Sequence, residues 1–198
     1  MRWRSLRAFA FLPFAVVAVR TIEARAAPPD PVTTQGPAAA ALGALDHYGD
    51  WIQVEPYGRV WSPTAVMADW RPYTLGTWAD GPHGWTWYSE LSWGAITYHY
   101  GRWTRDRTAR WFWVPGETWS PATVVWRAGG GFIGWAPLPP DPELLASGGV
   151  IPESAWIFVR ATDFQGSRLP VAALPLMWNG ATLACTSRSS PQLVALGR

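Results

Sequence analysis

Tryptophans dominate the apolar positions in the middle of the chain, and they recur in pairs. The members of each pair are 9 or 10 residues apart: Trp51/Trp61, Trp78/Trp87, Trp103/Trp113 and Trp126/Trp135. Between three of the pairs lie turn-forming sequences: EPYG (55–58), DGPHG (80–84) and AGGG (128–131). Because tryptophan favours strands, the pattern predicts four β-hairpins whose paired tryptophans face each other across the two strands.

The first three hairpins also share a sequence repeat, since each opens with Gly-x-Trp: GDW (49–51), GTW (76–78) and GRW (101–103). Trp85 and Trp87 are two residues apart, as are Trp111 and Trp113, so each set lies on one face of a strand. We therefore predict an all-β fold, an antiparallel meander of about four Trp-paired hairpins. Such a meander forms a small barrel or a sandwich, and the periodicity does not decide between the two.

The pattern changes on both sides of this region. Residues 27–44 are rich in Pro and Ala and are expected to form a linker, whereas residues 45–140 form the Trp-rich β domain. Residues 141–160 contain a short helical turn in DPELLAS (141–147) and a returning strand in AWIFVR (155–160). Residues 161–198 are expected to be an extension that ends in a flexible tail from about residue 180.

The N-terminus has the pattern of an export signal. Arginines at positions 2, 4 and 7 precede the apolar run Ala8–Val19, and Ala24-Arg25-Ala26 fits a cleavage site after Ala26. The run is shorter than the roughly 20 residues that span a bilayer, which favours a cleaved signal peptide over residues 1–26. The alternative is an uncleaved signal anchor. We expect an exported protein in the periplasm or cell envelope of a bacterium, with no transmembrane span after signal removal.

Removal of the signal changes the charge of the chain. The whole chain has 16 basic and 14 acidic residues, and residues 1–26 hold five arginines and Glu23, which leaves 11 basic and 13 acidic residues in the remainder. Nucleic-acid binding requires clustered positive charge, so we expect no nucleic-acid partner. The single cysteine, Cys185, excludes an intramolecular disulfide.

Several of these motifs occur together in a known family. The ordered segments YGDW (48–51), GRVWSP (58–63), WRPYTLGTW (70–78), GWTW (84–87), WGAITYHYGRW (93–103), WFWVPGETWSPATVVWR (111–127) and GWAPLPP (134–140) resemble the exported bacterial domain-of-unknown-function family 6600. The resemblance covers about residues 45–140, with weaker similarity in AWIFVRATDF (155–164). It implies an envelope-targeted bacterial protein, often Pro-rich, and it supplies no activity and no catalytic residues.

Catalytic and metal motifs are sparse. The three histidines, His47, His83 and His99, do not have the spacing of a zinc site, so no metal and no cofactor are expected. Glu90 and Glu117 are the carboxylates considered for a glycoside hydrolase pair. An envelope hydrolase acting on a polysaccharide through a carboxylate or histidine site is therefore the alternative function.

The surplus of aromatic residues supports a binding function more strongly. Most tryptophans are expected in the core, but some rings should remain exposed and mark a contact surface. The motif YHYGRW (98–103) is predicted as a strand, with His99 and Trp103 on one face and Tyr98, Tyr100 and Arg102 on the other. The candidate binding residues are Tyr98, Tyr100, Arg102, Arg71 and Arg127. The predicted function is a non-catalytic exported binding or structural module whose partner is an envelope glycan or an envelope protein.

Overall fold

The computed structural model describes residues 41–141, 143, 149–165 and 169–189, all of which belong to the unit Gln35–Arg198. The predicted signal peptide and nearly all of the linker lie outside these residues. Eight strands form the four predicted hairpins: β1 (Gly49–Val54), β2 (Gly58–Pro63), β3 (Gly76–Ala79), β4 (Thr86–Ser89), β5 (Arg102–Arg105), β6 (Trp111–Val114), β7 (Val124–Gly129) and β8 (Phe132–Pro137). Two later strands follow, β9 (Ile157–Arg160) and β10 (Ser187–Ser189).

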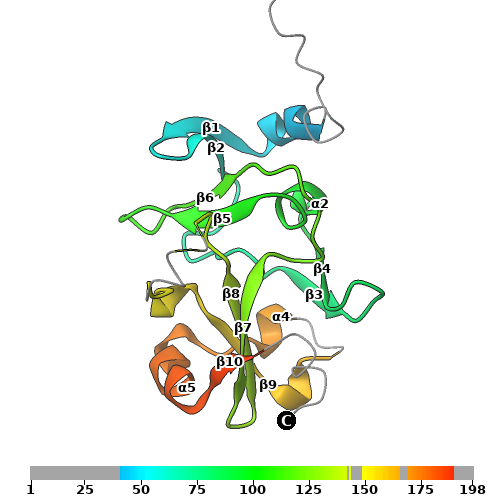
Figure 1. The fold of residues 1–198 in the computed structure, drawn as a ribbon, viewed down its shortest axis with the longest axis vertical. Coiled ribbons are helices and arrows are strands. Elements are labelled where there is room, and N and C mark those ends of the chain that lie inside the picture. The colour runs from blue at the N-terminus through cyan, green and yellow to red at the C-terminus, as the bar shows by residue number, and fades with distance from the viewer. Residues whose placement is uncertain (1–40, 142, 144–148, 166–168, 190–198) are drawn as a thin grey trace, which may run out of the picture. The chain divides into compact units, whose positions relative to one another are not determined.

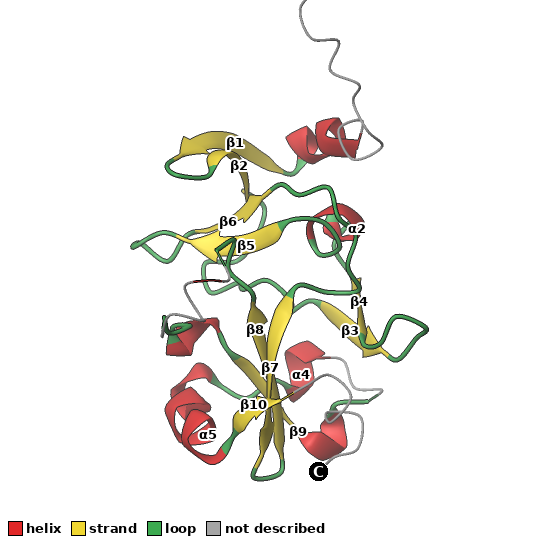
Figure 2. Ribbon diagram, in the orientation of Figure 1, coloured by secondary structure: helices red, strands yellow, loops and turns green. Residues whose placement is uncertain are grey.

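Helical segments are short and connect or flank the strands (Figure 2). They are the α-helices α2 (Gly94–Thr97), α4 (Leu169–Ala172) and α5 (Asn179–Cys185), and the 3-10 helices η1 (Gly43–His47), η2 (Glu153–Ala155), η3 (Ala161–Asp163) and η4 (Leu176–Trp178). The predicted helical turn over 141–147 lies almost entirely outside the described residues. No helix in the described part of the chain is long and apolar enough to cross a membrane.

The all-β prediction is confirmed, and the strands form three antiparallel sheets (Figure 1). The first sheet has the order β1-β2-β6-β5, the second β10-β7-β8-β9, and β3 and β4 pair as a separate hairpin. The described strands form no closed barrel. Because β2 pairs with β6, the first and third hairpins share one sheet. β9 and β10 flank the fourth hairpin, and α4 and α5 both contact β9.

All four predicted tryptophan pairs are directly opposed in the hairpins: Trp51 with Trp61, Trp78 with Trp87, Trp103 with Trp113, and Trp126 with Trp135. Trp61 is also opposed to Trp113 where β2 meets β6. A row of four tryptophans therefore crosses the first sheet in the strand order β1, β2, β6 and β5. Edge-on contacts between their rings, such as Trp61–Trp103 at 6.2 Å between centroids, stabilise this row.

Packing explains the glycine of the Gly-x-Trp repeat in the same way in all three hairpins. Gly49, Gly76 and Gly101 each lie under the indole ring of the tryptophan in the opposite strand. A Cβ atom at Gly49 would lie 2.7 Å from the Trp61 ring, one at Gly76 2.7 Å from the Trp87 ring, and one at Gly101 2.9 Å from Trp113 Nε1. Each glycine therefore leaves the space that the opposing indole fills.

The core is built from tryptophan. Of the 15 tryptophans that the structure describes, 12 are buried, Trp51 is half-buried, and Trp119 and Trp178 are exposed. Four buried indoles donate to backbone carbonyls: Trp61 to Leu45, Trp103 to Thr97, Trp113 to Tyr100, and Trp135 to Tyr73. One continuous cluster joins this core to buried residues that follow the Trp-rich domain, among them Trp156, Phe158, Phe164 and Leu169. From here on, the extension means all described residues after 148.

Two local predictions were wrong. YHYGRW does not form one strand, because α2 ends at Thr97 and β5 begins only at Arg102, after Gly101 turns the chain with φ +65°. Tyr98 is consequently fully buried instead of lying on an outer face. The flexible tail was expected from about residue 180, but residues 179–189 form α5 and β10. Residues 190–198 lie outside the described part.

Candidate binding pocket

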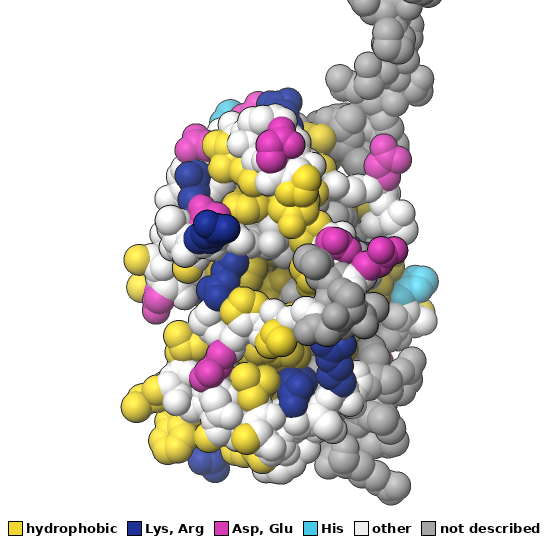
Figure 3. Space-filling model, turned by 60° about the vertical axis from the view of Figure 1, so that its left-hand side comes forward, with side chains coloured by type: hydrophobic (Ala, Val, Ile, Leu, Met, Phe, Trp, Pro, Cys, Tyr) yellow, Lys and Arg dark blue, Asp and Glu magenta, His cyan; other side chains and the backbone are white. Residues whose placement is uncertain are grey.

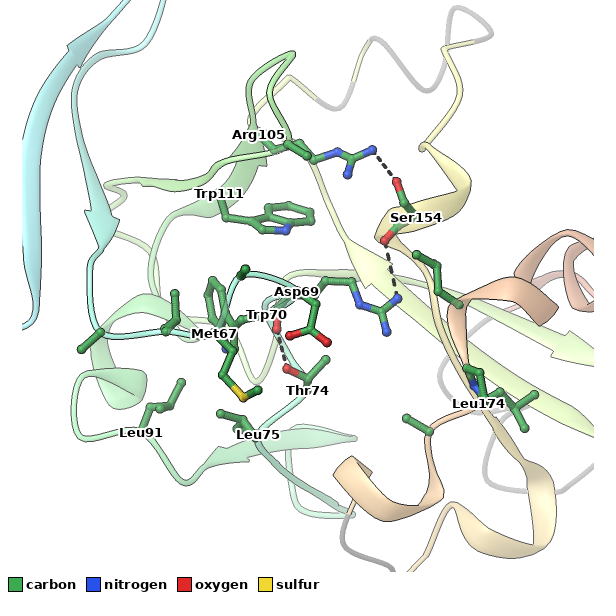
Figure 4. A pocket seen from close by; sticks show the side chains of 18 residues that line it. Met67, Asp69, Trp70, Thr74, Leu75, Leu91, Arg105, Trp111, Ser154 and Leu174 are labelled. Carbon is green, nitrogen blue, oxygen red and sulfur yellow. Dashed lines mark hydrogen bonds between the residues drawn. The ribbon is translucent and has the colours of Figure 1, made fainter.

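A pocket of about 540 Å³ lies where three distant segments meet (Figure 4). The connector between β2 and β3 supplies residues 65–71, 74 and 75, and the β5–β6 hairpin supplies Arg105, Ala109 and Trp111. The extension supplies Ser154 and residues 173–176, and Leu91 completes the lining. The volume lies within the range of about 300–1,000 Å³ that is typical of ligand pockets.

Most of the lining is apolar. Trp70 and Trp111 are both 8% exposed, and their rings form a rigid part of the wall. Trp70 is fixed by edge-on contacts to Trp93 and Trp103, with centroid distances of 5.7 and 5.4 Å. Aliphatic side chains and a methionine complete the apolar lining: Val66, Met67, Leu75, Leu91, Leu174 and Leu176. Such a surface favours an apolar group of a ligand.

Two arginines converge on one residue at the edge of the pocket. Arg105 Nη2 donates to the Ser154 hydroxyl at 2.6 Å, whereas Arg71 Nη1 lies 3.5 Å from the Ser154 carbonyl oxygen and 2.6 Å from that of Trp156. Burial lowers the pKa of Arg71 below its usual value, and the negative charge of Asp69 partly opposes this shift. The pocket therefore combines apolar walls with two guanidinium groups and one carboxylate.

Exposed apolar side chains occur in the pocket lining and next to it in the sequence. Met67 and Leu176 line the pocket and are 77% and 47% exposed, and Met177 and Trp178, which follow Leu176 in η4, are 84% and 55% exposed. We call these four residues the apolar rim. Figure 3 shows a face of the molecule where hydrophobic side chains and arginines lie around a hollow. Exposed apolar side chains beside a pocket are typical of interaction sites.

The structure separates the sequence-predicted binding residues. Arg71 lines the pocket, whereas Arg102 donates to the Pro139 carbonyl oxygen at 3.0 Å and lines a different pocket. Arg127 donates to the carbonyl oxygens of Leu183 and Thr186 and to the Thr186 hydroxyl. Tyr98 is buried, and Tyr100 is half-buried against the core. These five residues do not form one surface.

A second pocket, of about 380 Å³, has a mixed lining. Polar side chains come from Arg102, Glu117, Thr118, Ser120 and Thr123, and Gly101, Gly116, Ala122, Val124 and Leu138 complete the lining. Trp119 lies between two lining residues in the sequence and is 42% exposed. Its ring stacks on His99 with centroids 5.6 Å apart and meets His83 edge-on at 5.3 Å.

Two of the histidines considered for catalysis, His83 and His99, contact the same ring, that of Trp119. His99 Nδ1 lies 2.9 Å from the Ser120 carbonyl oxygen, which only accepts, so this nitrogen carries the proton. Glu117 lines the second pocket and Glu90 does not. Within the described residues, no group of three or more His, Cys, Asp or Glu side chains is placed to hold a metal ion.

Sequence reasoning missed the main pocket because one of its walls belongs to the extension. Arg71 was predicted as a binding residue and lies beside Trp70 in the segment WRPYTLGTW, but their partners Ser154 and Leu174 are about 80 to 100 residues away in the sequence. The signal that was present is the apolar run LPLMW (174–178), which contains three residues of the rim and two further lining residues, Leu174 and Pro175.

Together, the sheets and the aromatic core define a small all-β module with a tryptophan-rich interior. The chain belongs to the Family of unknown function (DUF6600), whose profile matches residues 42–142, slightly more than half of the sequence. No curated protein and no solved structure shows significant similarity to it.

Proposed function

We propose that this chain is an exported, non-catalytic binding module of the bacterial cell envelope, and that its main pocket holds an apolar segment of an envelope protein. The observation that carries the proposal is the pocket of about 540 Å³ between the Trp-rich domain and the extension. Its rigid aromatic wall at Trp70 and Trp111 provides a preformed site. Preformed apolar pockets bind with little loss of conformational entropy in the protein.

The apolar rim favours a polypeptide over a small apolar molecule. Leu176 belongs to both the pocket and the rim, so a ligand that fills the pocket can continue over Met177 and Trp178. Protein interfaces commonly combine one anchor side chain in a pocket with a surrounding apolar contact area. Tryptophan, methionine and arginine are all enriched at such interfaces, and all three occur here.

Site-specific photo-crosslinking in cells that carry the gene tests this proposal. Benzoylphenylalanine at Met67, which lines the pocket, should give a discrete cross-linked protein. The matched control is the same probe at Val171, which is 87% exposed and does not line the pocket. We expect the Met67 product to disappear with protease treatment, to persist after treatment with glycan hydrolases, and to be reduced by Leu176→Asp but not by Val171→Asp.

Two results would contradict the proposal. One is a set of products that is the same for the probes at Met67 and Val171, which would indicate random collisions. The other is an absence of any product from Met67 while the protein is folded and abundant in the same cells.

The second pocket supports a second candidate, the binding of an envelope glycan. Its hydroxyl groups, Glu117 and Arg102 offer donors and acceptors, and Trp119 presents an exposed ring near the pocket-lining residues Thr118 and Ser120. Co-sedimentation of the protein with purified sacculi and a panel of polysaccharides tests this candidate. Trp119→Ala and Arg102→Gln should reduce co-sedimentation, and a wild-type protein that remains in the supernatant would exclude it.

A further inference from the structure

The pocket has an excess of positive charge next to its apolar lining. Arg71 and Arg105 both contact Ser154 at one edge of the pocket, and Asp69 supplies the carboxylate of the lining. Asp69 acts on Arg71. Among the described residues, Arg105 has no carboxylate partner and makes one hydrogen bond, to Ser154 Oγ.

Arg105 is therefore equipped to bind a further acceptor. A guanidinium group carries five N–H donors in a planar arrangement that matches a carboxylate, and Ser154 uses one of them. Arg105 lies over the ring of the directly opposed Trp111, 5.7 Å from the ring centroid. This contact holds the guanidinium beside the aromatic wall, where a bound apolar side chain would lie.

A second donor in the same lining has no acceptor. Trp70 is 8% exposed, and its buried Nε1–H makes no hydrogen bond within the described part of the protein. This Nε1 atom is itself fully buried, as are the unpaired Nε1 atoms of Trp78 and Trp87, so Trp70 adds an aromatic surface to the pocket and no donor that a ligand can reach. Arg105 therefore carries the evidence for a ligand that has acceptor oxygens beside an apolar group.

If the main pocket binds a polypeptide, as proposed above, its charges specify the chemistry of that polypeptide. We infer that the segment bound in the main pocket carries a carboxylate next to its apolar anchor, and that Arg105 pairs with this carboxylate. The source is a polypeptide, an acidic residue or a chain terminus beside a large apolar residue, because the apolar rim extends the contact beyond the pocket. Arg71 is not assigned to this carboxylate, because its Nη1 already donates to the Trp156 carbonyl oxygen.

Selection of displayed random peptides on the full chain tests the inference. Peptides are kept when they bind the wild type and lose binding to Met67→Asp, which introduces a charge into the pocket lining. We expect the selected peptides to share a large apolar residue next to Asp, Glu or a free C-terminus. Neutralising that carboxylate as the amide should weaken binding to the wild type about tenfold.

A double-mutant cycle then assigns the carboxylate to Arg105. Arg105→Gln should weaken the acidic peptide about as much as its neutralisation does, and it should change the binding of the amide peptide little. Arg107→Gln is the matched control, because Arg107 is an exposed arginine of the same hairpin that does not line the pocket. It should leave the binding of both peptides unchanged.

The outcomes separate the two proposals. The inference would be overturned if the selected peptides had no carboxylate. It would also be overturned if neutralising the carboxylate weakened binding equally in the wild type and in Arg105→Gln. Either result would leave the protein-binding function intact. A selection without any peptide sensitive to Met67→Asp would overturn both. A fatty acid is the remaining alternative. The site would be assigned to a fatty acid, and the polypeptide source refuted, if decanoate bound more tightly than decanol and displaced the acidic peptides while the chain gave no cross-linked protein in cells.

Discussion

Arg71 donates a hydrogen bond from Nη1 to the backbone carbonyl oxygen of Trp156, which is 2.6 Å away in space and 85 residues later in the chain. Arg102 and Arg127 act in the same way, toward Pro139 and Leu183. The three arginines that the sequence suggested as ligand-binding residues therefore also connect distant backbone segments. Arg71 holds the extension against the connector, and this contact forms one edge of the main pocket.

Arg71→Met should destabilise the protein. The substitution preserves the aliphatic stem but leaves the carbonyl oxygens of Trp156 and Ser154 without the guanidinium, and we expect a loss of about 1–3 kcal/mol in the free energy of unfolding. Denaturant titration should show a lower midpoint with an unchanged slope. Arg107→Met, at an exposed position, should stay within about 0.5 kcal/mol of the wild type. Equal stability of the two variants would refute the role given to Arg71.

The glycine of the Gly-x-Trp repeat should tolerate no side chain. In Gly49→Ala the new methyl group would meet the Ser62 carbonyl oxygen and the Trp61 ring, so we expect a loss of about 1–3 kcal/mol from overpacking. Gly43→Ala is the control, because a Cβ atom at Gly43 has no neighbour within 4 Å. Thermal unfolding of both variants would check this, and a stable Gly49→Ala would show that the repeat has another cause.

Two buried tyrosines should make the fold sensitive to alkali. Burial raises the pKa of Tyr73 to about 12 and that of Tyr98 well above 10. Above pH 10 the unfolded chain therefore loses these protons before the folded chain does, and the free energy of unfolding falls as the pH rises. Tyr73 alone should remove about 2 kcal/mol by pH 12.

Denaturant midpoints measured between pH 8 and about pH 12 would show this fall. Tyr98→Phe should reduce its slope and should not destabilise the protein at neutral pH, because the Tyr98 hydroxyl has no hydrogen-bond partner in the described part of the chain. Tyr88→Phe, at a 59% exposed position, should leave the slope unchanged. A flat profile in the wild type would contradict the assigned burial.

Contacts between residues close in the sequence could be predicted, whereas contacts between distant segments could not. The opposition of Trp103 and Trp113 was predictable because a hairpin is local, and its turn sets the register of the two strands. The pairing of β2 with β6 and that of β10 with β7 depend on packing between distant segments, which no local pattern reports. The pocket was missed for the same reason, because Ser154 and Leu174 meet Trp70 only in the folded chain. Tyr98 was misplaced because an aromatic run beside Gly101 has the composition of a strand although the chain turns there.

The predicted export signal can be tested at the N-terminus of the protein. If the cleavage site after Ala26 is used, Edman sequencing or mass spectrometry of the protein from the cell envelope should give a chain that begins at Ala27. Ala26→Pro should block processing and cause the full-length precursor to accumulate. A wild-type protein that retains residues 1–26 in the envelope would support the uncleaved anchor, and one that remains in the cytoplasm would refute export.

A chain that ends at residue 142, where the family match ends, should not fold cooperatively. It lacks β9 and β10, and with them the buried side chains of Trp156, Phe158, Phe164 and Leu169, which share one core with the Trp-rich domain. Each large apolar side chain contributes about 1.5–3 kcal/mol on burial, and a domain has about 5–15 kcal/mol of net stability, so the loss should exceed what the domain can absorb. Near-UV circular dichroism and the denaturant transition would show this, with a chain that ends at Ser189 as the control. A cooperative transition in the shorter chain would instead show that the four hairpins suffice, and that the extension serves only to build the wall of the pocket.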